Sequence, residues 1–514
     1  MQVITKIFAV LSAVVLVVNL SSVNSANVTI DGSQEYQTIE GLGGCEGWIF
    51  PPNTLYSEIF DDLGVSMLRF RMLRYTESKP DENNEARDND NDDPFVIDWS
   101  GVDTSMLKYI APLLQAAQSR GVKLIGTIFS PPSWMKTNGV AEQGGYLKSG
   151  YEDELVEFIL IWVKAIEKYH GIHVDYVSIQ NEPNTTCCFT SYSSSQLRDI
   201  IKLLGARFEA EGVTTGIYSP DISGLGAFSG YVNTICGNPV AMAYVDRLAT
   251  HNYTANFWNP DGMILQLTSA YNLANSYGKK LWLTEYCDDQ SNYGTWNEGL
   301  ALVQHLHDAL VYGQVSAWLT YEIYRDPSGK AFSIYDDSGQ ITPKFYHLKQ
   351  YFRYVRPGAV RVETASSDTD ILVTSFVHND SNTFTVAAIN RSSSNQDVTF
   401  GISNISGLSV LDVIRTSSTE NADSVDQVIV SGNSFNYILP DSSITTFTGA
   451  ISNPVRTDNV GIRWGNSMEL MVSPNPFSLS TTMTYKNNCN PLNIAIYDIS
   501  GNLINNFRNI KKKS

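Results

Sequence analysis

Short apolar runs rich in β-branched residues alternate with amphipathic stretches between about residue 40 and residue 355. Eight runs have the length of a buried strand, and they span residues 40–44, 65–72, 122–130, 174–181, 215–221, 245–253, 280–286 and 316–324. The stretch that precedes Gly171 places Leu155, Ile159 and Ile166 on one helix face. Strands that alternate with helices in this way predict an α/β fold with a (β/α)8 TIM barrel over residues 40–355.

The pattern changes after residue 355. Strand-length runs separated by Ser, Asn, Asp and Gly continue to Gly449, which predicts an antiparallel β-sandwich side domain over residues 356–449. Residues 27–39 precede the barrel and are expected to add strands to this sandwich. A polar linker over 450–467 then leads to a short C-terminal β unit over 468–514.

The first 26 residues have the pattern of a secretory signal peptide. Lys6 precedes an apolar run from Ile7 to Val18, and small residues follow near Ser25. The run is shorter than the roughly 20 apolar residues that a membrane span needs, and no later stretch is long enough. We therefore expect a secreted or cell-surface protein without a membrane span.

Composition and charge exclude several classes of function. The content of 43% hydrophobic and 17% charged residues is that of a globular protein. A formal net charge of −18 argues against nucleic acid as a partner. Six cysteines are too few for a disulfide scaffold, and they show no zinc-ligand spacing with histidine. The sequence carries no marker of oligomerisation, so a monomer is the default expectation.

Two glutamates stand at the ends of predicted strands. Glu182 follows the fourth run, in "VSIQNEPN", and Glu285 closes the seventh, in "LWLTEY". Either residue alone is commonplace at a strand end that meets solvent. In a (β/α)8 barrel, however, the C-terminal ends of all strands share one mouth. Glycoside hydrolysis needs such a pair, one carboxyl protonated and the other ionised.

A series of motifs supports this interpretation. The segments "IEGLGGCEGWIF", "LRFRM", "FSPPSWMKTNG", "IQNEPN", "THNY", "LTEYC" and "FSIYDDSGQITPKFYHLKQYFRYVRPGAVRV" resemble, in this order, those of glycoside hydrolase family 30. The resemblance covers about residues 28 to 448 and includes the side sandwich of the family. It implies retaining hydrolysis of β-glycosidic bonds, with Glu182 as acid/base and Glu285 as nucleophile about 5–5.5 Å apart. It implies no metal and no cofactor.

The resemblance also implies substrate-binding roles. Asn181 would donate to the sugar 2-hydroxyl, and Arg69 would hold Glu285 ionised. Tyr253 would hydrogen-bond the nucleophile, and Trp134 would form an apolar wall for a sugar face. The weaker subsite candidates are Trp48, Tyr286, Trp318 and Tyr321. A surface ion pair, a core tyrosine or a tryptophan packed under a loop is the structural alternative for these residue types.

The glycan is less sharply indicated. Family xylanases that recognise glucuronic acid use an arginine and tyrosines after the eighth strand, where this chain has Tyr324 and Arg325. Arg325 can meet a uronate in a bidentate contact, but the flanking residues depart from the pattern and Glu322 would repel an acidic branch. We expect a retaining endo-β-glycosidase of plant cell-wall polysaccharide, acting on β-1,4-xylan or glucuronoxylan. A β-1,6-glucanase, a β-1,6-galactanase or an exo-acting β-glycosidase of the family is the alternative.

A second class of function is a non-catalytic glycan-binding protein that keeps the barrel. The joint presence of Arg69, Asn181, Glu182, Tyr253 and Glu285 argues for catalysis, because binding alone does not need this set. No HExxH-like or GxSxG pattern supports a metallohydrolase or a serine hydrolase.

The terminal "SPNPF" and "YDISG" segments resemble part of the C-terminal sorting domain of type IX secretion cargo.

Overall fold

The computed structural model describes most of the chain from residue 26 to residue 452, together with five strands between residues 460 and 510. The gaps in the first range are residues 48, 73–90, 92, 101, 103, 106, 142, 186–188, 254–259, 288–293, 325–332 and 337. The predicted signal peptide therefore lies outside the described residues except for Ala26. No helix in the described part of the chain is both long and apolar enough to cross a membrane.

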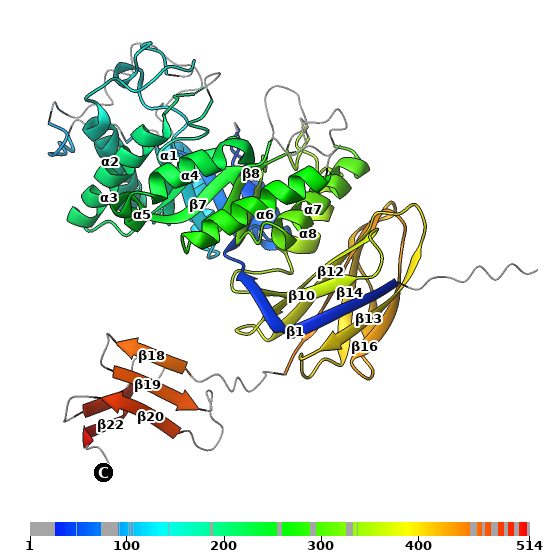
Figure 1. Ribbon diagram of the computed structural model, residues 1–514. Helices are drawn as coiled ribbons and strands as arrows, with labels where there is room; N and C mark the ends of the chain where they lie inside the picture. Colours follow the sequence, from blue (N-terminus) through cyan, green and yellow to red (C-terminus); the bar gives the residue numbers. More distant parts are fainter. Residues whose placement is uncertain are drawn as a thin grey trace, which may run out of the picture. The chain divides into compact units, whose positions relative to one another are not determined.

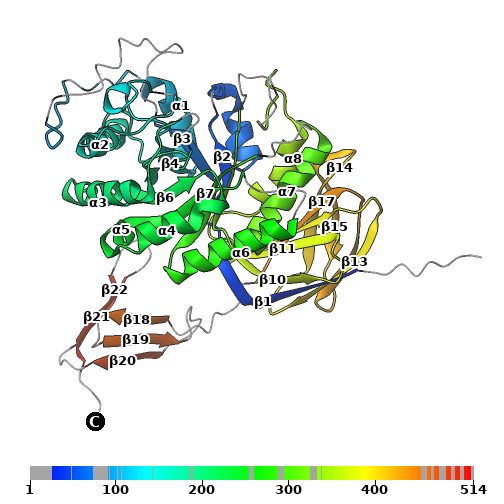
Figure 2. The same ribbon diagram turned by 45° about the horizontal axis from the view of Figure 1, so that its top comes forward.

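Eight parallel strands close into a barrel (Figures 1 and 2). They are β2 (Gly41–Cys45), β3 (Met67–Arg71), β4 (Lys123–Thr127), β5 (Tyr176–Ser178), β6 (Gly216–Ile222), β7 (Val245–His251), β8 (Lys280–Tyr286) and β9 (Ala317–Thr320). β2 pairs in parallel with β9 as well as with β3, which closes the ring. Each strand falls within or overlaps one predicted run, so the predicted barrel is confirmed.

Helices lie around the barrel between successive strands (Figure 2). They are α1 (Leu107–Gln118), α2 (Glu152–His170), α3 (Ser194–Ala210), α4 (Phe228–Cys236), α5 (Pro239–Tyr244), α6 (Pro260–Ser276), α7 (Trp296–Val311) and α8 (Pro343–Phe352). Short helical turns cover Asn53–Leu55, Glu58–Asp62, Ser133–Met135 and Leu225–Ala227. α2 buries the predicted face of Leu155, Ile159 and Ile166 and ends at Gly171, whose φ of 66° suits a residue without Cβ.

Large and small side chains fill the interior of the barrel. The inward cluster consists of Met67, Ile125, Tyr218, Ala249, Trp282, Ala317 and Leu319. The inward cluster includes no residue of β2. Only glycine fits at position 43, because a Cβ atom there would lie 1.9 Å from the carbonyl oxygen of Met67. The glycines of "GLGG" therefore allow β2 to approach β3 closely.

A half-buried carboxylate ties the N-terminal ends of several barrel strands together. Glu40 lies just before β2 and accepts hydrogen bonds from Arg247 Nη2 at 2.7 Å and Trp282 Nε1 at 2.8 Å. The Ser316 hydroxyl donates to it at 3.0 Å. Burial opposes ionisation of Glu40, but the bonds and charge of Arg247 outweigh it and hold the pKa at about 2.

A nine-stranded, mostly antiparallel sheet follows the barrel (Figure 1). Its order is β15 (Glu420–Ile429), β14 (Val410–Ser417), β17 (Ser443–Ala450), β12 (Thr383–Asn390), β11 (Ile371–His378), β10 (Val360–Ser366), β1 (Ala26–Thr38), β13 (Gln396–Ser403) and β16 (Ser434–Leu439). β1 thus joins the sheet between β10 and β13. The rings of Phe400 in β13 and Phe447 in β17 lie 5.2 Å apart although their strands are far apart in the order. The sheet therefore folds over itself into two layers, as predicted.

The barrel and this sheet form one compact unit. Gln350 and Tyr351 of α8 make hydrogen bonds with Thr416 of β14 and Thr374 of β11, at 2.8 and 2.9 Å. A second unit contains residues 405–408 and 450–514. Its strands are β18 (Val460–Trp464), β19 (Met468–Ser473), β20 (Thr482–Asn487), β21 (Leu492–Tyr497) and β22 (Leu503–Ile510). β18 forms inside the segment that the sequence pattern predicted as a linker.

Because the pKa of Glu40 is lower in the folded chain than its ordinary value of 4.5, Glu40 stabilises the fold above about pH 4.5 and loses this contribution as the pH falls toward 2. Glu40→Gln should therefore lower the free energy of unfolding by about 2–3 kcal/mol at pH 7 and flatten its acid dependence. Urea unfolding at pH 7 and pH 3 measures both effects. The control is Glu211→Gln, which removes an exposed ion pair with Lys164 and should cost less than about 1 kcal/mol. Equal losses in the two variants would contradict the assignment.

Candidate active site

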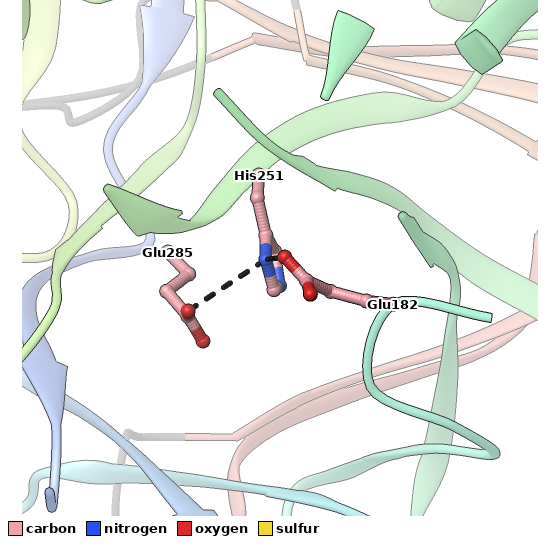
Figure 3. A group of neighbouring side chains, drawn as sticks. All are labelled: Glu182, His251 and Glu285. Atoms are coloured by element: carbon pink, nitrogen blue, oxygen red, sulfur yellow. Dashed lines mark hydrogen bonds and ion pairs between the residues drawn. The ribbon is translucent and has the colours of Figure 1, made fainter. Parts of the chain in front are cut away.

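The two predicted glutamates meet at the C-terminal end of the barrel. Glu182 lies just after β5 and Glu285 lies in β8. One carboxylate oxygen of each lies within 4.8 Å of the other and of a nitrogen of His251. Figure 3 shows the three side chains pointing toward one another. Residues that are distant in the sequence therefore share one site.

Irregular pairing aims Glu285 at the mouth. The register between β8 and β7 shifts between Thr250 and His251, and the register between β8 and β9 shifts between Leu283 and Tyr286. An extra residue in a strand bends it and redirects the side chains that follow. β8 carries this irregularity on both sides, immediately before its carboxylate.

Two residues of the site have left-handed backbone conformations. Glu182 has φ 47° and Asp221 has φ 58°. The backbone N–H of Glu182 donates to the carbonyl of Asp221 at 2.9 Å, which links the end of β5 to β6. Such conformations are costly for residues with a Cβ and are concentrated at functional sites. The backbone around the site is therefore held by tertiary contacts rather than by local preference.

Arg69 is the buried cation of the site, with 1% exposure. Its Nη1 donates to Glu285 Oε2 at 2.6 Å, and its Nη2 donates to Asn181 Oδ1 at 2.6 Å and to Asp221 Oδ2 at 2.9 Å. Burial opposes ionisation of Asp221, but the Arg69 charge outweighs it and holds the Asp221 pKa well below its usual range. Arg69 thus compensates two carboxylates and fixes the orientation of one amide.

The other oxygen of Glu285 is held by Tyr253, whose hydroxyl donates to Oε1 at 2.5 Å. Burial and the charge of Glu285 raise the pKa of Tyr253 well above its ordinary value. Tyr253 therefore keeps its proton and remains a donor to Glu285 at neutral pH. With Arg69 on Oε2, both oxygens of Glu285 have fixed positions.

His251, which the sequence analysis did not select, joins the two glutamates. It is fully buried, and its Nδ1 lies 3.0 Å from Glu182 Oε1 and 3.8 Å from Glu285 Oε1. Its Nε2 lies 3.4 Å from Asp221 Oδ1. Burial disfavours the imidazolium, but Glu285, Asp221 and Glu182 together raise the pKa of His251 to about 10. The three carboxylates therefore favour the imidazolium form of His251, whose Nε2 also lies 3.4 Å from Arg69 Nη2.

A small pocket opens beside these residues. Its lining consists of Cys45, Glu46, Gly47, Arg69, Phe70, Arg71, Phe129 and Tyr321. It reaches the site through Arg69 and through the Cys45 thiol, which lies 4.0 Å from Glu285 Oε2. Of the weaker subsite candidates, Tyr321 is placed in this pocket.

Two predicted subsite residues belong to the core, which corrects the expectation. Tyr286 and Trp318 are 1% and 0% exposed. The ring of Tyr286 stacks on His305 with centroids 3.4 Å apart, and Trp318 Nε1 donates to His305 Nδ1 at 3.1 Å. Both rings lie in the hydrophobic layer outside the barrel. They have no face available for a sugar.

The remaining candidates are placed elsewhere. Tyr324 is 8% exposed, and its ring packs 5.7 Å from that of Tyr335, so it too is a core residue in this structure. Trp134 is half-buried, and its ring lies 5.9 Å from that of Tyr151. The sugar-wall role of Trp134 stays a prediction. Trp48 and Arg325 lie outside the described residues.

Glu182, His251 and Glu285 form a geometric set that a metal ion could contact. These groups already have protein partners, since Glu182 Oε1 lies 3.0 Å from His251 Nδ1. Arg69 already supplies positive charge to Glu285. We therefore assign no metal to this site.

Comparisons with known proteins show the family of the chain. Residues 60–324, more than half of the chain, match O-Glycosyl hydrolase family 30. The chain is 26% identical to glucuronoxylanase XynC of Bacillus subtilis (strain 168) over 437 residues, 82% of this chain and 92% of the relative. It is 25% identical to endo-1,6-beta-D-glucanase neg1 of Aspergillus fumigatus over 397 residues, 68% of this chain and 78% of the relative.

A solved structure has the same fold. The crystal structure of a GH30 endoxylanase from Clostridium papyrosolvens superimposes with a TM-score of 0.68 at 22% identity. The likeness covers 82% of this chain and 100% of that chain. At this identity it supports the barrel and its side domain and says nothing of the substrate.

Replacing Arg69 should damage both stability and activity. Arg69→Met leaves the buried carboxylates of Glu285 and Asp221 without their cation, so the free energy of unfolding should fall by about 3–5 kcal/mol. Adding Asp221→Asn should recover part of this loss, because the two changes are coupled. Chemical unfolding measures each variant.

The control is Arg120→Met, which breaks an ion pair with Asp61. The side chain of Arg120 is 32% exposed and that of Asp61 is 50% exposed. This substitution should cost less than about 1 kcal/mol. If Arg69→Met were as stable as this control, Arg69 would not be the compensating charge of the site.

Proposed function

The chain belongs to O-Glycosyl hydrolase family 30, and from this membership we propose that it is a secreted, retaining endo-β-glycosidase that cleaves plant cell-wall xylan. Glu285 is the proposed nucleophile and Glu182 the proposed acid/base. The observation that carries the proposal is the separation of the two carboxylates, with oxygens within 4.8 Å. Retaining enzymes hold the pair about 5–5.5 Å apart, whereas inverting enzymes need about 6.5–9.5 Å to admit a water.

In the first step, an oxygen of Glu285 attacks the anomeric carbon while the glycosidic C–O bond breaks. The leaving oxygen takes the proton of Glu182, and a glycosyl ester forms on Glu285. In the second step, the Glu182 carboxylate takes a proton from a water molecule, and this water attacks the anomeric carbon. The ester bond breaks, which restores the Glu285 carboxylate and the protonated Glu182.

The neighbouring contacts support these roles. Arg69 and Tyr253 hold the two oxygens of Glu285, which orients the nucleophile before attack. Asn181 Oδ1 accepts from Arg69, so its Nδ2 is the part of the amide left to donate to a sugar hydroxyl. A protonated His251 Nδ1 can donate a hydrogen bond to Glu182 Oε1, which lies 3.0 Å away. This hydrogen bond would stabilise the carboxylate that forms when Glu182 gives its proton to the leaving oxygen.

The choice of xylan rests on the relatives. The glucuronoxylanase XynC relative matches 92% of its own length, which favours a xylan, with or without glucuronate branches. The endo-1,6-beta-D-glucanase relative keeps a β-1,6-glucan as the alternative. A β-1,6-galactan and exo-action on single terminal sugars are further alternatives within the family. The non-catalytic glycan-binding alternative has no support from the comparisons.

The wider organisation is also part of the proposal. Residues 1–26 would direct secretion, residues 40–355 would catalyse, and residues 27–39 with 356–449 would form the side domain. After the linker 450–467, the unit over 468–514 would act in type IX sorting, on the motif resemblance alone. The enzyme would act as a monomer on its polysaccharide.

A polysaccharide panel tests the proposed function. The purified chain is incubated with unbranched β-1,4-xylan, glucuronoxylan, β-1,6-glucan and β-1,6-galactan, and the products are separated by length. A ladder of oligosaccharides from at least one xylan is expected, since endo-action cuts within the chain. Glu285→Gln should reduce the rate by at least about 1,000-fold, and Glu211→Gln serves as the control. Release from neither xylan would overturn the choice of substrate.

A further inference from the structure

The pocket beside the nucleophile contains a carboxylate that the proposed chemistry does not use. Glu46 lies just after β2, and its backbone N–H donates to the carbonyl of Arg69 at 2.9 Å. It is 2% exposed and lines the pocket. This bond ties the backbone of Glu46 to Arg69 at the end of β3, and Arg69 in turn contacts Glu285.

Only one oxygen of Glu46 is satisfied by the described residues. Oε1 accepts from Arg71 Nε at 2.9 Å and from the backbone N–H of Arg71 at 3.0 Å. Oε2 is buried and has no hydrogen-bond partner within the described part of the chain. A buried acceptor without a donor is costly, so this oxygen requires a donor from solvent or from a bound ligand.

The nearby cations are already engaged. Arg71 Nη2 donates to the carbonyl of Gly47 at 3.0 Å, in addition to the bonds with Glu46. Arg69 serves Glu285, Asp221 and Asn181. Burial raises the pKa of Glu46, and the nearby Arg71 charge offsets this effect only in part. The pocket therefore offers an acceptor rather than a free cation.

Aromatic rings form other parts of the lining. Phe129 follows β4, and its ring centre lies 5.9 Å from the Arg69 guanidinium and 5.8 Å from that of Arg71. Tyr321 follows β9 and also lines the pocket. A small pocket with aromatic walls and one buried acceptor suits a polyhydroxylated ring. Since Arg69 and Cys45 reach Glu285 from this pocket, a ring bound here lies on the nucleophile side of the scissile bond.

We propose that Glu46 accepts a hydrogen bond from a hydroxyl of the sugar bound on the nucleophile side, and that this pocket selects a neutral sugar over a uronic acid. A neutral ring brings the hydroxyl donor that Oε2 lacks. A uronic acid brings a second carboxylate next to Glu46, where both arginines are already paired, and like charges repel. This inference rests on the proposed roles of Glu182 and Glu285, but it does not depend on the glycan being xylan.

Glu46→Gln tests the inference. The amide keeps the shape and an oxygen for Arg71, but it places an N–H donor where Oε2 stood and removes the negative charge. The quantity measured is kcat/KM for a neutral oligosaccharide and for the same oligosaccharide with a uronic acid unit on the nucleophile side. We expect a loss of about 10- to 100-fold on the neutral substrate, typical of a lost charged hydrogen bond. The acidic-to-neutral ratio should rise by at least about 10-fold.

Matched measurements separate this effect from damage to the fold. Glu167→Gln, an exposed carboxylate on α2, should leave both substrates unchanged. In a Glu285→Gln background, calorimetry of neutral-oligosaccharide binding should show weaker binding when Glu46→Gln is added, with unchanged chemical unfolding. Equal effects on neutral and acidic substrates, or no effect, would overturn the inference, as would a wild-type preference for the acidic substrate.

Failure of the proposed function is distinguishable from failure of this inference. If the polysaccharide panel shows cleavage of β-1,6-glucan and not of xylan, the choice of glycan is wrong. The comparison of neutral and acidic oligosaccharides is then made with that linkage, and Glu46→Gln gives the same two outcomes.

Discussion

The site depends on one buried cation. Arg69 contacts Glu285, Asp221 and Asn181 at 2.6–2.9 Å from inside the barrel mouth. Without it, the carboxylates of Glu285 and Asp221 would share a water-poor space with no guanidinium to pair with. With it, the pKa of Asp221 is held well below its usual range, and Glu285 and Asp221 together raise the pKa of His251 beside Glu182. Five strand ends of the barrel, β3, β5, β6, β7 and β8, thus contribute to one network of ion pairs and hydrogen bonds.

The sequence predicted the scaffold well, and the reason is physical. Parallel barrel strands are covered on both faces, so they appear as apolar runs that local pattern can locate. A carboxylate that interrupts such a run, as at Glu285, is visible for the same reason. Asp221 ends the run over 215–221 and His251 ends β7, so the same strand-end signal could have found them. The hydrogen-bond partners of these strand-end residues cannot be predicted from the local pattern, because they lie on other strands that are distant in the sequence.

The aromatic candidates show where pattern fails. In β9, Ala317 and Leu319 point into the barrel interior whereas Trp318 belongs to the outer layer. Sequence alone does not reveal which of two alternating faces a tryptophan occupies near a strand end. Irregular pairing adds to the difficulty, since the register shifts in β8 change which residues face the mouth. Glu46 escaped notice because its importance comes from an unsatisfied oxygen, which only coordinates show.

The central claim is that Glu182 and Glu285 are close enough to cleave by double displacement. The most direct measurement is the anomeric configuration of freshly formed product, followed by proton magnetic resonance during the first minutes of hydrolysis of a β-linked substrate. The account predicts that the β-anomer appears first and equilibrates with the α-anomer only later. Initial formation of the α-anomer would show that water attacks the sugar directly, and it would contradict the account.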